Sequence, residues 1–179
     1  MSVTNYTARH LTTLVRLWIM AIRPRTLTIA LVPVMTGSAL AYYDSGHFRF
    51  AVFLATLLAA LLIQAGTNLL NDAADFHRGG DGPDRIGPPR VTASGWIPAP
   101  RIAQAAFGCF ALAGLAGLYL VWAGGWGIMA LGILSLLAAY SYSNGPWPIS
   151  YTSFGEVFVV AFFGLAAVGG TYYLHSGTL

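Results

Sequence analysis

The segment AVFLATLLAALLIQAGTNLLNDAADFHRGGDGPDRIGPPR (residues 51–90) decides the fold, because it joins a long hydrophobic run to a dense group of charges. A transmembrane helix needs about 20 consecutive, mostly apolar residues, and the run Ala51–Asn71 meets that requirement. Four of the six acidic residues of the chain follow, between Asp72 and Asp84. Because carboxylates are costly close to lipid, their concentration here predicts a functional site at the membrane surface.

The composition places the whole chain in the membrane. Of its 179 residues, 56% are hydrophobic and only 8% are charged, whereas soluble domains carry about 25% charged residues. The mean hydropathy is +0.66. The apolar runs predict an all-α fold, a multi-pass bundle of five transmembrane helices preceded by one helix in the membrane interface. The predicted spans are Leu27–Tyr43, Ala51–Asn71, Ile102–Trp122, Trp126–Tyr142 and Phe154–Tyr173, and the interfacial helix is His10–Ile22.

These elements form one membrane domain, residues 1–179, because no long polar stretch separates a second domain from it. Residues 1–22 are its N-terminal cytoplasmic or interfacial segment. Residues 76–101 are too polar for lipid and too rich in Gly and Pro for one uninterrupted helix. We therefore expect them to fold over the site as a cytoplasmic cap loop.

All nine basic residues are arginine, and their distribution predicts the orientation of the chain. Four precede the first span and four lie between the second and third spans, whereas the other connections carry only Arg49. Because arginine-rich connections stay in the cytoplasm, the acidic cluster is predicted on the cytoplasmic face of the inner (cytoplasmic) membrane. The arginines form no broad basic face, which argues against nucleic acid as a partner.

Side chains with oxygen ligands share one face of the second predicted span. Asn68, Asn71, Asp72 and Asp75 are spaced i, i+3, i+4 and i+7, so a helix that continues through them presents all four together. Hard oxygen ligands without His or Cys at matching spacing favour Mg²⁺ over Zn²⁺. Solvated acids at a helix end are the alternative, and four aligned oxygen residues make that alternative the weaker one.

The loop beyond this helix supplies further charges. Asp81 and Asp84 are placed to complete a metal shell, while Arg78, Arg85 and Arg90 carry planar donors suited to phosphate oxygens. Metal and arginine together at a membrane surface predict a site for a lipid diphosphate whose hydrophobic tail runs between the helices. Neutralising the leaving diphosphate would lower the barrier to breaking its C–O bond.

A second group of candidate residues lies near the cytoplasmic ends of the last two spans. Tyr142, Asn144 and Tyr151 belong either to the aromatic belt of a membrane protein or to a site where aromatic faces stabilise a cation. Glu156 either orients an acceptor molecule or is a helix-start carboxylate favoured by the helix dipole. All four are candidates for an acceptor site.

The string Asn71-Asp72-Ala-Ala-Asp75 resembles the first aspartate-rich motif, NDxxDxxxD, of the UbiA superfamily of intramembrane aromatic prenyltransferases, with the next acid delayed to Asp81. That spacing, together with GPPRVTASG (87–95) and YSNGPWPISYTSFGEVFVVAFFG (142–164), looks like the branch that prenylates 1,4-dihydroxy-2-naphthoate on the route to menaquinone. The resemblance covers most of the chain and defines the expectations that follow.

The resemblance implies that Mg²⁺ and the aspartate motif bind a polyprenyl diphosphate, that ionisation produces an allylic cation, and that the electron-rich ring attacks it. In the naphthoate branch the ring carboxylate is lost, and the product is a demethylmenaquinone. Carried onto this sequence, the implied catalytic residues are Asn71, Asp72 and Asp75, the metal ligands Asn68, Asp72, Asp75 and Asp81, and the diphosphate-binding residues Asn68, Arg78, Arg85 and Arg90.

Members of this superfamily have about nine spans and a second aspartate-rich motif in their later half, whereas no acid follows Glu156 here. We therefore expect this chain to be the N-terminal portion of such an enzyme, with doubtful activity by itself. Three alternatives stay open: another aromatic acceptor such as 4-hydroxybenzoate or homogentisate, a non-catalytic protein that binds a phosphorylated lipid or carries an ion, and an inactive fragment or subunit completed by another polypeptide.

Overall fold

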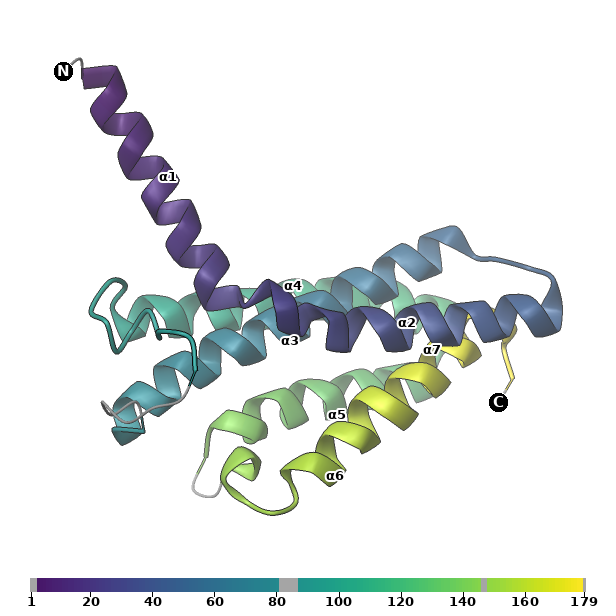
Figure 1. Ribbon diagram of the computed structural model, residues 1–179. Helices are drawn as coiled ribbons and strands as arrows, with labels where there is room; N and C mark the ends of the chain where they lie inside the picture. Colours follow the sequence, from purple (N-terminus) through teal and green to yellow (C-terminus); the bar gives the residue numbers. More distant parts are fainter. Residues whose placement is uncertain (1–2, 81–86, 146–147, 179) are drawn as a thin grey trace.

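The computed structural model describes residues 3–80, 87–145 and 148–178, and the side chains from Thr12 onward. Within these ranges the chain is helical and contains no strand, which confirms the predicted all-α class (Figure 1). Five helical segments are long and apolar enough to cross a membrane, in agreement with the predicted number of spans. The elements are α1 (Val3–Ile22), α2 (Pro24–Ser45), α3 (Phe50–Arg78), α4 (Ala99–Gly124), α5 (Trp126–Ser143), the 3₁₀ turn η1 (Ile149–Tyr151), α6 (Gly155–Val159), the π-helical turn η2 (Val160–Ala166) and α7 (Ala167–Ser176).

Helix α1 projects away from the bundle, and its last part packs against the other helices (Figure 1). The predicted interfacial helix ended correctly at Ile22 but began too late, since α1 starts at Val3. The helix stops because Arg23 adopts a left-handed backbone conformation and Pro24 occupies the first turn of α2, where its missing N–H costs nothing. Leu17 and Trp18 pack on a buried cluster formed by α3, α4 and the segment between them.

Helix α3 runs without interruption through the acidic motif to Arg78, so the predicted continuation of the second span is confirmed. Gly79 ends it in the left-handed conformation with φ 68°, which glycine adopts without steric cost. Residues 76–78 therefore belong to α3, and residues 99–101 belong to α4. The connection that we predicted over 76–101 is shorter at both ends, because the helices continue into it, and its residues 87–98 form the part described here as the cap segment.

Small residues allow the helices to approach closely. A Cβ atom added to Gly66 of α3 would lie 2.6 Å from the Phe110 ring of α4, and one added to Gly37 of α2 would lie 2.5 Å from the Val168 carbonyl oxygen of α7. Since lipid provides no hydrophobic driving force between spans, such close contact is a main source of their association. These contacts place α3 against α4 and α2 against α7.

The last span is one continuous helix whose middle is a π-helical turn. Its far end is tied to the rest of the bundle through His175, whose Nδ1 accepts a hydrogen bond from the Arg49 backbone N–H at 3.3 Å. The other ring nitrogen lies 3.1 Å from Ser38 Oγ, and in the neutral ring it donates that bond because Nδ1 is the acceptor. The Arg49 guanidinium also donates to the Leu174 carbonyl at 2.9 Å. Helices α2, α3 and α7 are thus joined at the end opposite the acidic motif.

Candidate functional site

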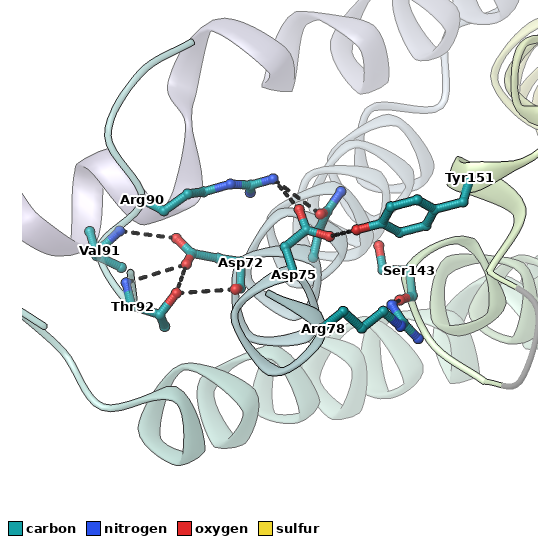
Figure 2. Close-up of polar contacts among 9 residues, drawn as sticks. Asp72, Asp75, Arg78, Arg90, Val91, Thr92, Ser143 and Tyr151 are labelled. Carbon is teal, nitrogen blue, oxygen red and sulfur yellow. Dashed lines mark hydrogen bonds and ion pairs between the residues drawn. The ribbon is translucent and has the colours of Figure 1, made fainter. Parts of the chain in front are cut away.

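Asp72 turns its carboxylate toward the cap segment and is only 1% exposed (Figure 2). The backbone N–H groups of Val91 and Thr92 each donate to it at 3.3 Å. The Thr92 hydroxyl donates to the same carboxylate and also lies 3.1 Å from the Asp72 carbonyl oxygen. Both carboxylate oxygens therefore hold the cap segment against the end of α3.

Asp75 lies one turn further along α3 and is bound from two other directions (Figure 2). Arg90 forms an ion pair with one carboxylate oxygen, and the hydroxyl of Tyr151 donates to the other at 2.6 Å. The same Arg90 guanidinium donates to Asn71 Oδ1 at 3.2 Å. Arg90 is 7% exposed, and a buried guanidinium requires such a partner because desolvating an unpaired charge is costly.

Arg78 connects the end of α3 to the segment between α5 and α6. Its guanidinium lies beside Ser143 (Figure 2) and donates to the Ser143 carbonyl oxygen at 2.6 Å. It also donates to the Gly145 carbonyl oxygen at 3.2 Å. It also lies 5.8 Å from the centre of the Tyr151 ring, within the range of a cation–π contact. The motif helix, the cap segment and the α5–α6 connection consequently meet at one place, although up to 76 residues separate Tyr151 from Asp75 in sequence.

Asn68 faces a different neighbour. Its amide nitrogen donates to the Ile22 carbonyl oxygen at 2.7 Å and to Thr26 Oγ1 at 2.8 Å, and its own oxygen accepts a 3.4 Å bond from Gln64. The structure therefore places Asn68 against the turn between α1 and α2. Asn71, Asp72 and Asp75 instead contact the cap segment, and in the structure these three residues form the acidic cluster. Three other predicted site residues of the loop, Asp81, Asp84 and Arg85, lie outside the described residues.

The four acceptor candidates are not brought together. Tyr151 lies on Asp75, as described above, whereas the Tyr142 ring stacks on Phe158 with 6.1 Å between the ring centres. Asn144 ends α5, where its backbone N–H donates to the Tyr140 carbonyl. Glu156 is exposed in the first turn of α6.

A cavity of about 600 Å³ extends through the bundle between α2, α3, α4, α5 and the last span. Arg23, Asn68 and Asn71 line one end, and the walls beyond are mostly apolar, with uncharged polar side chains such as Gln64 and Ser135 among them. Along α3 its lining runs from Asn71 back to Thr56, which is about 22 Å at 1.5 Å per residue. Its wall, among the described residues, includes neither Asp72 nor Asp75, whose carboxylates are turned toward the cap segment and Tyr151.

The oxygens of Asn71, Asp72 and Asp75 fit Mg²⁺ in their chemistry, since carboxylate and amide oxygens are the ligands that this ion prefers. Over the described ranges 3–80, 87–145 and 148–178, no three His, Cys, Asp or Glu side chains are grouped for metal binding. Asp81 and Asp84, which belong to the same predicted set, fall outside those ranges. Arg90 and Thr92 already contact the three oxygen ligands, so a metal ion would share them or replace these contacts.

Two residues of the site were missed by sequence reasoning. Thr92 lies two residues after Arg90 in the glycine- and proline-rich loop, and a hydroxyl side chain close to an arginine there was the available signal. The second is Arg23, which lines the cavity. The sequence indicates only that it is one of the arginines that predict the orientation of the chain, and its position next to Pro24 indicates a helix break but not the direction of its side chain.

Comparison with known proteins places the chain in a family. The model of the UbiA prenyltransferase family matches residues 30–179. The chain is similar to a 1,4-dihydroxy-2-naphthoate octaprenyltransferase of Escherichia coli, with 39% identity over 168 residues, 90% of this chain and 54% of that protein. A protein of the same name from Mycobacterium tuberculosis is 36% identical over 156 residues, 87% of this chain and 53% of the relative. A 2-carboxy-1,4-naphthoquinone phytyltransferase of Synechocystis is 32% identical over 163 residues, 90% and 52% of the two chains.

The chain spans about half the length of the curated relatives that it matches. Within that half, the match includes the acidic motif, the cap segment and all the walls of the cavity from residue 30 onward. On this match, the chain belongs to the UbiA prenyltransferase family.

Proposed function

We propose that this chain takes part in transferring a polyprenyl group from a polyprenyl diphosphate to 1,4-dihydroxy-2-naphthoate, in menaquinone biosynthesis. The similarity to proteins named for that reaction supports the substrate pair. The observation that carries the proposal within this chain is the cavity, which is mostly apolar along its length and whose lining includes Arg23, Asn68 and Asn71 beside the acidic cluster. A lipid diphosphate has the same division into an apolar tail and a charged head.

In the proposed reaction the C–O bond between the prenyl chain and diphosphate breaks, and the diphosphate leaves with the bonding electrons. The ring carbon that carries the carboxylate forms the new C–C bond to the prenyl carbon. Loss of CO₂ then returns the electron pair to the ring and gives the demethylmenaquinone in its reduced form. No additional oxidant or proton donor is needed to balance this step.

The proposed metal ligands are Asp72, Asp75 and Asn71, with Asp81 assisting. Mg²⁺ bound to these residues would neutralise part of the negative charge of the diphosphate. Arg90 already lies on Asp75 and Asn71, so in the proposal its guanidinium transfers from the carboxylate to a phosphate oxygen. Asn68 supports the α1–α2 turn in this proposal, because its amide is bound there.

Arg78 and Arg85 complete the proposed diphosphate contacts from the end of α3 and the loop. Binding of Arg78 to the Ser143 and Gly145 carbonyl oxygens supports a role in holding the α5–α6 connection beside the diphosphate. Tyr142 and Phe158 lie in the wall of the cavity, where their faces are placed to stabilise an allylic cation. Asn144, Tyr151 and Glu156 stay proposed acceptor-site residues, with Tyr151 supported by its bond to Asp75.

The proposed location is the inner membrane, with the acidic cluster on its cytoplasmic face. The contacts between α3, the cap segment and the α5–α6 connection bring Arg78 and Arg90 to one end of the bundle, together with Arg23 and Arg25 at the start of α2. Arg49 lies at the opposite end, against Leu174. This asymmetry supports the orientation, because arginine-rich ends stay in the cytoplasm.

The experiment uses this chain alone and a hybrid in which the C-terminal half of the Escherichia coli relative follows it. Membranes containing either chain are incubated with radiolabelled polyprenyl diphosphate, dihydroxynaphthoate and Mg²⁺, and the extracted lipids are separated. We expect a prenylated naphthoate from the hybrid, and none when Mg²⁺ is chelated.

Parallel reactions with 4-hydroxybenzoate and homogentisate test the acceptor. A product from either one, without a naphthoate product, would replace the proposed acceptor. Retention of the labelled diphosphate by the hybrid without any product would instead favour the non-catalytic lipid-binding protein.

A further inference from the structure

Arg23 has a backbone conformation that is unusual for its residue type. Its φ is 56° and its ψ is 73°. Among residues 3–80, 87–145 and 148–178, it is the only residue other than glycine that has a positive φ. The left-handed region is disfavoured for a residue with a Cβ atom, and residues held there concentrate at functional sites. The surroundings of Arg23 must therefore hold it in place.

The turn at Arg23 is fixed from both sides. The Arg23 N–H donates to the Ile19 carbonyl at 3.2 Å, and the Thr26 hydroxyl donates to the Arg23 carbonyl at 3.0 Å. Asn68, which is 7% exposed, reaches across from α3 and donates to both Ile22 and Thr26. A buried amide of the motif helix is thus used to hold the residues on either side of Arg23.

This turn places the Arg23 side chain in the wall of the cavity, at its polar end, with Asn68 and Asn71. Arg23 is partly buried, and the remainder of the lining is uncharged and mostly apolar. Arg25, two residues later, is exposed and does not line the cavity. Of these two neighbouring arginines, the one in the strained conformation is the one that reaches the cavity.

We propose that Arg23 is a substrate-binding residue whose guanidinium donates hydrogen bonds to the phosphate oxygens of a lipid diphosphate at the mouth of the cavity, with Asn68 as its positioning residue. A guanidinium presents several N–H donors in one plane and binds phosphate oxygens in pairs. The identity of the ligand as a lipid diphosphate rests on the proposed function, while the position and support of Arg23 do not. Arg23 also precedes the segment that the family model matches.

The test compares Arg23→Gly with Arg25→Gly in purified protein in nanodiscs, using radiolabelled farnesyl diphosphate with Mg²⁺ as the probe. Glycine suits the backbone at position 23, so the substitution removes the guanidinium without adding strain. We expect Arg23→Gly to weaken binding about tenfold or more, the range for a lost hydrogen bond to a charged group. Arg25→Gly should bind as the unchanged protein does, and Arg23→Lys should recover part of the loss. Farnesol, which lacks phosphate, should bind equally to all four proteins.

The outcomes separate the two proposals. If the unchanged protein binds farnesyl diphosphate and Arg23→Gly binds it equally well, the role of Arg23 is overturned while the proposed function stands. If the unchanged protein binds farnesyl diphosphate no better than farnesol, the proposed function fails, and the role of Arg23 fails with it.

A second measurement needs no variant and decides the question if Arg23→Gly does not fold. Phenylglyoxal modifies accessible arginines of the unchanged protein, and mass spectrometry locates the modified residues. Farnesyl diphosphate should protect Arg23 and leave Arg25 reactive. Equal modification of Arg23 with and without the diphosphate would overturn the proposal.

Discussion

Thr92 donates its hydroxyl hydrogen bond to the carboxylate of Asp72, across 20 residues of sequence. The backbone N–H groups of Val91 and Thr92 point at the same carboxylate. Asp72 is more deeply buried than Asp75, and hydrogen bonds from the cap segment stabilise its negative charge. In this state Asp72 holds the cap segment, and any ligand of its carboxylate would have to compete with these hydrogen bonds.

Replacing Thr92 by valine should destabilise the folded protein by about 1–3 kcal/mol, the usual cost of leaving a buried charged group short of a hydrogen bond. Valine has nearly the same shape, so the loss reports the hydroxyl. The free energy of unfolding would be measured by denaturant titration in detergent. Ser94→Ala, at an exposed position of the same cap segment, is the matched control and should change little. Equal stability of Thr92→Val and Ser94→Ala would contradict the role of this bond.

Arg90→Met should lower the free energy of unfolding by about 3–5 kcal/mol, because it leaves the Asp75 carboxylate buried without its cation. Adding Asp75→Asn to this variant removes the uncompensated charge and should restore much of the loss. A double-mutant cycle of unfolding free energies measures the coupling. Strictly additive effects of the two substitutions would show that the ion pair contributes no stability.

Tyr151→Phe keeps the ring beside Arg78 and removes the hydroxyl that donates to Asp75. We expect a loss of about 1 kcal/mol and faster amide hydrogen exchange in residues 149–155, because the α5–α6 connection loses its bond to α3. Exchange in α4 should be unchanged. Unaltered exchange in 149–155 would mean that Arg78 alone holds this connection.

Gly66→Ala should lower stability by about 1–3 kcal/mol, because the new methyl group would overlap the Phe110 ring. Combining it with Phe110→Leu should recover part of the loss by making room. Gly108→Ala in α4 is the control, since nothing lies within 4 Å of its added Cβ atom. That control should be neutral or stabilising by up to about 1 kcal/mol, as alanine favours helices more than glycine does. If Gly66→Ala left the stability unchanged, α3 and α4 would have to move apart easily to make room for the methyl group.

Asp72→Asn and Asp75→Asn, each placed in the hybrid chain, should reduce prenyl transfer on the order of 100-fold or more, as losses of electrostatic stabilisation do. The amide keeps the shape and removes the negative charge that a divalent cation needs. Membrane insertion, followed by protease protection of the loops, should be unaffected. Near-normal transfer by both variants would reject their role at the metal.

The sequence predicted the parts of the fold that depend on local composition. Apolar runs of bilayer length gave five spans, and the i, i+3, i+4, i+7 spacing correctly predicted that helix α3 continues to Asp75. The π-helical turn over 160–166 was not predicted, because VAFFGLA reads as ordinary helix in any local pattern. The left-handed conformation of Arg23 was not predicted either, because a residue before proline usually adopts an extended conformation.

The site was predictable in its residue types but not in its pairings. Asn68 shares a helix face with Asp72 and Asp75 in sequence, yet its amide is bound by Ile22 and Thr26, 46 and 42 residues away. Tyr151 was placed with the acceptor candidates, and its hydroxyl is on Asp75. Such contacts depend on how the helices pack, and periodicity within one helix carries no information about that.

The bond network of His175 fixes the end of the last span that lies away from the acidic cluster. Its opposite end, from Gly155, meets lipid with large exposed side chains such as Val157, Val160 and Leu165. The connection that leads into this end is bound to α3 through Tyr151 and Arg78, so polar contacts hold the last span near both of its ends and apolar packing holds its middle.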